Sequence, residues 1–194
     1  MQFLNDLFPL ALLTIIALAA VAFANVAGAQ VPEPQGYWMG PLHSDVPETL
    51  SGARVLDTKA LEELLQKGMP VLIDAASVPH RPDNLAPGAI WMPVPHQNIL
   101  GSVWLPGIGE GKLEASFEAY YQEQLTALTG KDRDRQIVFY CHPQCWASWN
   151  AAKRALAWGY RNVGWYRDGA EGWQEAGHRL ASAKAEGPPP VARR

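Results

Sequence analysis

The sequence places its only two cysteines where an apolar run gives way to a helical pattern. Residues 137–160 read IVFYCHPQCWASWNAAKRALAWGY, with Cys141 and Cys145 four positions apart. A cysteine that ends a buried strand and precedes a helix has its thiolate stabilised by backbone N–H groups and by the helix dipole. The pattern therefore predicts a nucleophilic thiol at Cys141, with a second thiol within reach.

The pair is suited to three kinds of chemistry. Cys141 could carry a persulfide that Cys145 resolves, or the two thiols could undergo dithiol–disulfide exchange. A CxxxC pattern with neighbouring His142 could also bind Cu(I), which prefers soft ligands. An inert structural disulfide is the remaining alternative, because exported proteins commonly carry one.

The spacing also limits how the two cysteines bond to each other. If both were helical, their Cβ atoms would lie about 5–6 Å apart, whereas a disulfide needs about 3.5–4.5 Å. A loop conformation would close this gap with some strain. We therefore expect a bond that is easily reduced, and a loop this short constrains the unfolded chain little.

The first thirty residues have a different character from the rest. Residues 7–24 are almost all apolar, and Ala27-Gly28-Ala29 follows as a site of the kind that signal peptidase accepts. No Lys or Arg precedes the apolar stretch. We expect a signal peptide over 1–29, cleaved after Ala29, and a periplasmic protein. An uncleaved membrane anchor is the alternative, since the stretch is near the lower length limit for a spanning helix.

Composition limits the class of the mature protein. The chain has 194 residues, a net charge of −3 and 48% hydrophobic residues. These values fit one packed domain with terminal extensions. The net charge does not suggest nucleic-acid binding, which requires a basic patch. Residues 30–52 are predicted to form an extended leader anchored by Tyr37 and Trp38, followed by a domain over 53–180. The Pro-rich, polar residues 181–194 are predicted to be disordered.

Strand and helix patterns alternate through the domain. Short apolar runs are typical of strands covered on both faces, whereas apolar positions at helical spacing indicate amphipathic helices. Thr58 is the expected N-cap of the first helix. The predicted strands are 53–57, 69–76, 135–141 and 162–167, with a further short strand within 85–94, and the predicted helices are 59–67, 116–130, 147–158 and 169–177.

This order predicts a single α/β domain: an open, mostly parallel sheet with helices on both faces. Sites in such sheets lie beyond the carboxyl ends of the strands, where Cys141 and Asp74 both occur. The long loop over 77–112 is uncommon unless it has a function, and His96 within it is expected to be exposed.

Residues 146–158, which include the last helix predicted before residue 160, carry three tryptophans and two basic residues. Trp146 and Trp149 are not expected to point inward together, so one is predicted to line the pocket and the other to pack in the core. Lys153 and Arg154 are expected on a solvated face. Asn150 is predicted to hydrogen-bond the loop, because Asn is mildly unfavourable inside a helix.

Several segments, taken in order, resemble the rhodanese-like domain and together cover most of residues 53–180. They are VLID (71–74), LAPGAIWMP (85–93), IVFYC (137–141), the following helix with GYRNV (159–163), and DGAEGWQEAG (168–177). The resemblance implies a rhodanese-like fold in which Cys141 is the nucleophile and the residues after it bind substrate. Those residues are His142, Gln144, Trp146, Ala147 and Ser148. Asp74 either orients the site, as the resemblance implies, or caps the loop after its strand.

A closer resemblance is to the CXXCW-motif proteins associated with PQQ-dependent catabolism. It is carried by CWASWNAAKRA (145–155), GSVWLP (101–106) and FYC (139–141). Members of that family are exported and are found near quinoprotein alcohol oxidation systems. The resemblance therefore implies a pathway more firmly than a reaction.

The loop after Cys141 departs from the rhodanese pattern. That pattern has small residues and an arginine near its end, but here Trp146 stands where the arginine is expected. Pro143 also removes one N–H donor. The departure implies a poorer cradle for thiosulfate.

The sequence thus predicts an exported rhodanese-like protein that uses Cys141 and Cys145 for sulfur transfer or thiol–disulfide chemistry in support of PQQ-dependent alcohol catabolism. The alternative is a protein without turnover, either a Cu(I) carrier or a module that docks through its Trp- and Pro-rich loop. The expected partner is a sulfur- or thiol-containing small molecule or a periplasmic redox protein, with a quinoprotein dehydrogenase or cytochrome as a further candidate. We expect no cofactor, no resident metal, no nucleic acid and no stable membrane insertion after cleavage.

Overall fold

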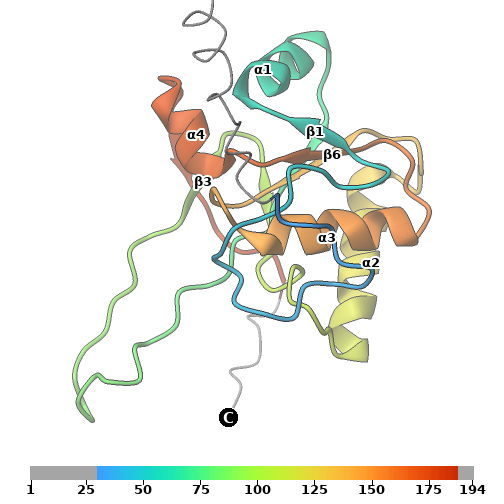
Figure 1. The fold of residues 1–194 in the computed structure, drawn as a ribbon. Coiled ribbons are helices and arrows are strands. Elements are labelled where there is room, and N and C mark those ends of the chain that lie inside the picture. Colours follow the sequence, from blue (N-terminus) through green and yellow to red (C-terminus); the bar gives the residue numbers. More distant parts are fainter. Residues whose placement is uncertain (1–29, 188–194) are drawn as a thin grey trace, which may run out of the picture. The chain divides into compact units, whose positions relative to one another are not determined.

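A five-stranded parallel sheet forms the centre of the domain. The computed structural model describes residues 30–187. The strands are β1 (Arg54–Leu56), β2 (Val71–Asp74), β4 (Val103–Trp104), β5 (Ile137–Tyr140) and β6 (Val163–Tyr166), in the spatial order β1-β6-β5-β2-β4. All neighbouring pairs are parallel, and β5 lies in the middle between β2 and β6. Figure 1 shows the neighbouring strands β1 and β6.

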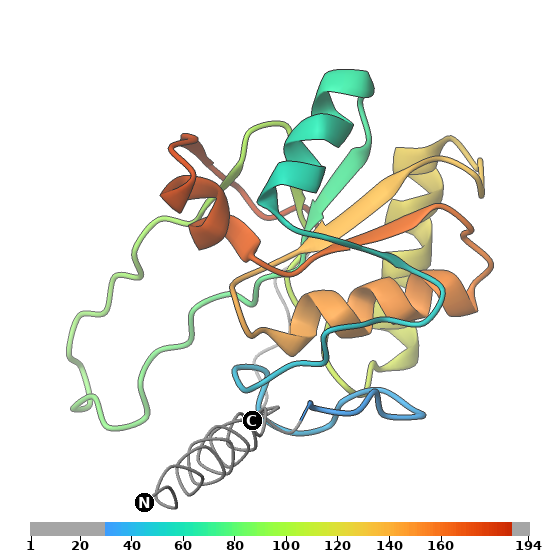
Figure 2. The ribbon, with the colours of Figure 1, turned by 45° about the horizontal axis from the view of Figure 1, so that its top comes forward.

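Four helices cover the two faces of this sheet. Helices α2 (Ala115–Thr129) and α3 (Trp146–Ala157) pack on one face, and α1 (Thr58–Lys67) and α4 (Gly169–Glu175) pack on the other (Figure 2). Each face therefore has its own apolar core. The predicted fold class, a single α/β domain with a mostly parallel sheet and helices on both faces, is confirmed.

Strand β5 shows why its sequence is a continuous apolar run. Phe139 points into the core beneath α2 and α3, whereas Val138 and Tyr140 point into the core beneath α1 and α4. Alternate residues of a strand point to opposite faces, so a strand covered on both sides needs apolar residues at every position. Cys141 directly follows this strand and its side chain lies on the α3 side.

Burial also keeps the hydroxyl of Tyr140 protonated. Burial, together with the Asp74 carboxylate, raises the pKa of Tyr140 well above its ordinary value. The hydroxyl donates to Ser102 Oγ at 2.7 Å and accepts the N–H of Ile99 at 3.0 Å. It thereby fixes the chain between β3 (Gln97–Ile99) and β4.

Local signals set the helix ends. The Asp57 side chain accepts the N–H of Ala60 at 2.7 Å, so Asp57 is the N-cap of α1 and Thr58 is its first residue. The predicted cap was therefore wrong by one residue. Gly130, at φ 64°, ends α2 in the left-handed conformation that glycine adopts most readily.

Two short strands lie outside the central sheet and were not predicted. β3 pairs antiparallel with β7 (Leu180–Ser182), and Glu186 N–H donates to the Trp104 carbonyl at 3.0 Å. Residues 181–187 therefore belong to the fold rather than to a disordered tail. Residues 188–194 of that predicted tail lie outside the described residues, as does the predicted signal peptide.

The loop between β2 and β3 contains no strand, so the option of a strand within 85–94 is wrong. Residues 77–96 run out from the end of β2 and come back to β3 as an extended excursion (Figure 1). Ile90, Met92 and Val94 in this loop are 82–89% exposed. Within residues 30–187, no helix combines the length and apolar character needed to cross a membrane.

Candidate active site at the end of strand β5

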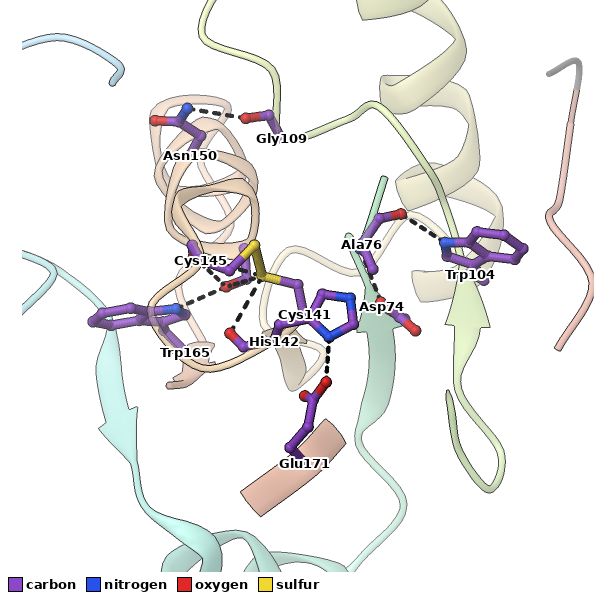
Figure 3. Close-up of a disulfide and its surroundings, with 11 residues drawn as sticks. Asp74, Ala76, Trp104, Gly109, Cys141, His142, Cys145, Asn150, Trp165 and Glu171 are labelled. Atoms are coloured by element: carbon purple, nitrogen blue, oxygen red, sulfur yellow. Dashed lines mark hydrogen bonds and ion pairs between the residues drawn. A yellow bond between two sulfur atoms is a disulfide. The ribbon is translucent and has the colours of Figure 1, made fainter. Parts of the chain in front are cut away.

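The two cysteines form a disulfide between the end of β5 and the start of α3. Cys141 follows the last residue of β5, Cys145 is the N-cap residue of α3, and their Cα atoms are 6.4 Å apart (Figure 3). Gln144 between them adopts φ 51°, which turns the loop back on itself. The loop conformation that the spacing required is therefore present.

The disulfide is shielded from solvent. Cys141 is 1% exposed and Cys145 is 3% exposed, whereas Pro143 and Gln144 at the tip of the loop are exposed. A reaction partner must therefore approach over the loop tip or displace a covering segment.

Part of the covering segment is the leader. Trp146 N–H donates to the Leu42 carbonyl at 2.8 Å, Ser44 N–H donates to the Gln144 carbonyl at 3.2 Å, and His43 forms a bridge with Cys145. The N–H group of Trp146, the first residue of α3, is thus already bonded.

Helix α3 holds the leader along its length (Figure 2). The Trp38 ring stacks on Trp146 at a centroid distance of 4.3 Å and an interplanar angle of 9°. Asn150 accepts the Trp38 N–H at 2.8 Å and donates to the Trp38 carbonyl at 3.0 Å. Lys153 donates to the Pro34 carbonyl at 2.7 Å.

This arrangement corrects two expectations about α3. Arg154 is only 3% exposed, because its guanidinium lies over the Tyr37 ring and donates to the carbonyl of Gly111. Burial lowers the pKa of Arg154 from its ordinary value. Trp146 and Trp149 are both fully buried, since the leader covers the side of α3 that does not face the sheet.

On the opposite side of the loop lies the first turn of α4. Ala170 N–H donates to the Cys141 carbonyl at 2.9 Å, and His142 Nδ1 pairs with Glu171 Oε1 at 2.7 Å (Figure 3). Gly169 adopts φ 67° and leaves no room for a Cβ atom against His142. The backbone of the loop is therefore fixed from both sides.

Asp74 does not contribute a polar contact to either cysteine. One carboxylate oxygen accepts the Ala76 N–H at 2.9 Å, and the other pairs with His96 Nε2 at 2.7 Å. His96 stacks on Trp104 and is largely buried, contrary to the expectation that it is exposed. Asp74 thus organises the neighbouring strand end.

The remaining predicted residues surround the loop in different ways. Ser148 Oγ lies 3.2 Å from Cys141 Sγ, and Ala147 is buried with its backbone against Gly109. Gln144 lines a cavity of about 360 Å³ beside the loop tip, together with Pro143, Thr58, Arg167, Asp168 and Glu175 among others.

Two residues that contact the site, Trp165 and Glu171, lie far from the cysteines in the sequence and were not predicted. Trp165 Nε1 donates to Ser148 Oγ at 3.0 Å, and Glu171 pairs with His142. The tryptophan in the predicted strand VGWY was a usable signal for the first, because a buried indole N–H needs an acceptor. Within residues 30–187 no group of three or more His, Cys, Asp or Glu side chains is arranged to hold a metal ion.

Comparison with known proteins now defines the family. The model of the rhodanese-like domain matches residues 57–176, which include both cysteines and Asp74. The chain belongs to the rhodanese-like domain family. No curated protein matches it.

Three solved structures are similar to this rhodanese-like chain. Thiosulfate sulfurtransferase from Pseudomonas aeruginosa shares 19% identity over 69% of this chain, with a TM-score of 0.46, and this chain spans about a fifth (21%) of that protein. The polysulfide-sulfur transferase homodimer from Wolinella succinogenes shares 17% identity over 70% of this chain and 82% of its own, with a TM-score of 0.41. An uncharacterized protein from Saccharomyces cerevisiae shares 18% identity over 66% of this chain and 95% of its own, also with a TM-score of 0.41.

Proposed function

We propose that this rhodanese-like protein uses Cys141 and Cys145 as a redox pair for sulfur transfer or thiol–disulfide exchange. One observation carries the proposal: the two cysteines are bonded at the junction between the central strand β5 and helix α3. Open α/β sheets hold substrates beyond the carboxyl ends of their strands, and this junction is such a position. A cysteine nucleophile there is also what the rhodanese family implies.

Sulfur transfer would proceed in two steps that start from the reduced cysteine pair. The Cys141 thiolate attacks the terminal sulfur of a persulfide donor, forms a Cys141 persulfide and releases the donor as a thiolate. Cys145, as a thiolate, then attacks Cys141 Sγ, which forms the disulfide and releases hydrosulfide. A dithiol protein or small molecule must afterwards donate two electrons to reduce the pair and becomes a disulfide itself.

The loop favours a donor with little negative charge. It contains no arginine, Pro143 offers no N–H, and the Trp146 N–H is bonded to Leu42. A dianion such as thiosulfate would lose its hydration without sufficient hydrogen bonds in return. We infer a persulfide or a protein disulfide as the substrate class.

The test measures sulfur release by the purified, reduced domain. We expect the wild-type protein to release hydrosulfide from a small persulfide and to form the Cys141–Cys145 disulfide at the same rate. Cys145→Ala should stop at the Cys141 persulfide, seen by mass spectrometry as one added sulfur atom. Cys141→Ala should do neither.

The reduction potential provides an independent check. A working pair should have a potential above about −300 mV, because structural disulfides in secreted proteins lie below that value. A potential well below it, combined with no sulfur release, would contradict the proposal.

We propose further that the protein is exported and serves PQQ-dependent alcohol catabolism. The apolar segment before Ala29 and the CXXCW resemblance support this placement. N-terminal sequencing of the native protein should find Gln30 first in the periplasmic fraction. A strain without the gene should grow poorly on an alcohol that a PQQ enzyme oxidises, and growth should return with the wild type but not with Cys141→Ala.

A docking role is the second candidate. Ile90, Met92 and Val94 expose three large apolar side chains on one loop, and monomeric proteins rarely group such exposure without a partner. In this case, replacing all three with serine should abolish growth on the alcohol, whereas replacing both cysteines should not.

Cu(I) carriage would instead appear as tight Cu(I) binding by the reduced protein that is lost in Cys145→Ser.

A further inference from the structure

The hydroxyl of Ser148 lies between the disulfide and a buried indole. Ser148 Oγ is 3.2 Å from Cys141 Sγ and 3.3 Å from the Cys145 carbonyl oxygen. Trp165 Nε1, from strand β6, lies 3.0 Å from the same oxygen (Figure 3). Ser148 and Trp165 are each 1% exposed, so no bulk water competes for these contacts.

The chemistry of the three groups fixes which one donates. An indole N–H only donates, so Trp165 must occupy a lone pair of Ser148 Oγ. The single hydrogen of Ser148 then has two nearby acceptors, the Cys145 carbonyl and Cys141 Sγ. A sulfur in a disulfide is a weak acceptor, so in the oxidised protein the hydrogen goes to the carbonyl.

Reduction changes this balance. A dithiol reductant supplies two electrons and one proton, which leaves Cys141 as a thiolate and Cys145 as a thiol, while the reductant closes to a disulfide and releases its second proton to solvent. The thiolate is now a charged acceptor within reach of Ser148. Hydrogen bonds to a charged group are stronger than those to a neutral carbonyl.

We propose that Trp165 is a positioning residue that directs the Ser148 hydroxyl toward Cys141, so that Ser148 donates a hydrogen bond to the Cys141 thiolate in the reduced protein. This inference rests on the proposed function, because only a pair that is reduced in use needs a stabilised thiolate. The Ser148 hydroxyl supplies a hydrogen-bond donor beside a loop that lacks an arginine and, at Pro143, one backbone N–H.

A purely structural role for the same contacts makes a different prediction. In that case Ser148 only satisfies the buried indole N–H, and Trp165 only fills the core between β6 and α3. Losing either side chain would then lower stability without changing the acidity of Cys141.

The test measures the thiol pKa of Cys141 in the full chain carrying Cys145→Ala, by thiolate absorbance as a function of pH. Ser148→Ala should raise this pKa by about one unit or more, the size expected for a lost hydrogen bond to a charged group. Trp165→Phe keeps the ring bulk and should raise the pKa in the same direction by a smaller amount. His142, which pairs with Glu171, adjoins Cys141 and is unchanged in all these variants. Its effect on the pKa of Cys141 is therefore the same in each and does not alter the comparison.

The double variant tests whether Trp165 acts through Ser148. Ser148→Ala combined with Trp165→Phe should raise the pKa no further than Ser148→Ala alone. Trp149→Phe is the matched control, because that indole is also fully buried and donates to the Thr49 carbonyl at 3.1 Å. It should lower stability without moving the pKa. An unchanged pKa in Trp165→Phe, or fully additive shifts in the double variant, would overturn the inference.

A second measurement avoids any change to the tryptophan. In the Cys145→Ala protein with 15N-labelled tryptophan, the Trp165 indole N–H resonance should shift with pH and follow the titration of Cys141. Ser148→Ala should abolish that dependence. A resonance that ignores the ionisation of Cys141 in the presence of Ser148 would overturn the inference even if Trp165→Phe fails to fold.

These results are separable from a failure of the proposed function. The thiol pKa and the indole resonance are measured without substrate, so they remain informative if no sulfur is released. Conversely, sulfur release that persists while the pKa of Cys141 is unaffected by Ser148→Ala would leave the function standing and reject the role of Trp165.

Discussion

Asn150 shows how one buried side chain can join three segments. It is fully buried in α3 and bonds both backbone groups of Trp38, and its amide also donates to the Gly109 carbonyl at 2.9 Å. The leader and the loop after β4 are therefore connected through a single residue. The mid-helix position that is mildly unfavourable for asparagine is compensated by these tertiary bonds.

We predict that Asn150→Ala lowers the free energy of unfolding by about 3 kcal/mol, because the partly buried backbone groups of Trp38 and the buried contact with Gly109 lose their partner. Urea denaturation followed by circular dichroism would measure the change. Asn162→Ala is the control: its amide bonds the Asp134 carbonyl at an exposed position, so its effect should stay within about 0.5 kcal/mol. Equal losses in the two variants would contradict this account.

Among individual residues, the sequence predicted which side chains lie near the two cysteines better than it predicted which groups the more distant side chains bond. Cys141, Cys145 and Ser148 come together because they are close in the chain, and the strand–helix junction fixes their order. For Asp74 the sequence left two roles open, orienting the site or capping the loop after its strand, and its carboxylate bonds Ala76 and His96. The direction in which a side chain leaves a strand end depends on the loop that follows, and no local pattern determines it.

At the scale of elements, α3 is buried on nearly all sides. The sheet covers one side, the loop after β4 covers another, and the leader covers the outer side. Gly109 allows the closest approach, because a Cβ atom there would overlap the backbone of Ala147. The position of the loop that carries the two cysteines therefore depends on a residue from a different part of the chain.

We predict that Gly109→Ala displaces the first turn of α3 and lowers the free energy of unfolding by about 1–3 kcal/mol, the usual cost of overpacking. The reduction potential of the disulfide should change with it, since Ala147 lies between Cys145 and Ser148. Gly36→Ala is a suitable control, because a Cβ atom at Gly36 meets nothing within 4 Å. An unchanged potential in Gly109→Ala would show that the loop does not depend on this contact.

The main strands and helices were predictable because each carries a strong local pattern. The strands β3, β4 and β7 were not predicted, since each spans only two or three residues inside a stretch that has the composition of a loop or a tail, and their pairing joins distant segments. The leader was predicted as extended, but its packing on α3 was not. Its Pro-rich residues have no periodicity, and the basic residues of α3 that hold it look like an ordinary solvated face.

At the scale of the whole molecule, the disulfide contributes little to the chain's ability to fold. The two cysteines are four residues apart, so the bond closes a very short loop. The entropy removed from the unfolded chain grows with loop length and corresponds here to about 2 kcal/mol. The apolar core beneath α1 and α4 contains neither cysteine, and the core beneath α2 and α3 contains both together with many other buried side chains.

We therefore predict that the reduced protein remains folded. Reduction should lower the free energy of unfolding by about 2 kcal/mol, while the near-ultraviolet circular dichroism of the buried tryptophans persists. Thermal unfolding with and without a dithiol reductant would measure this, and the Cys141→Ala, Cys145→Ala double variant should resemble the reduced wild type. Loss of tertiary structure on reduction would mean that the bond is a structural staple. Persistence of the fold would mean that the chain can use its dithiol form as a stable, reactive state.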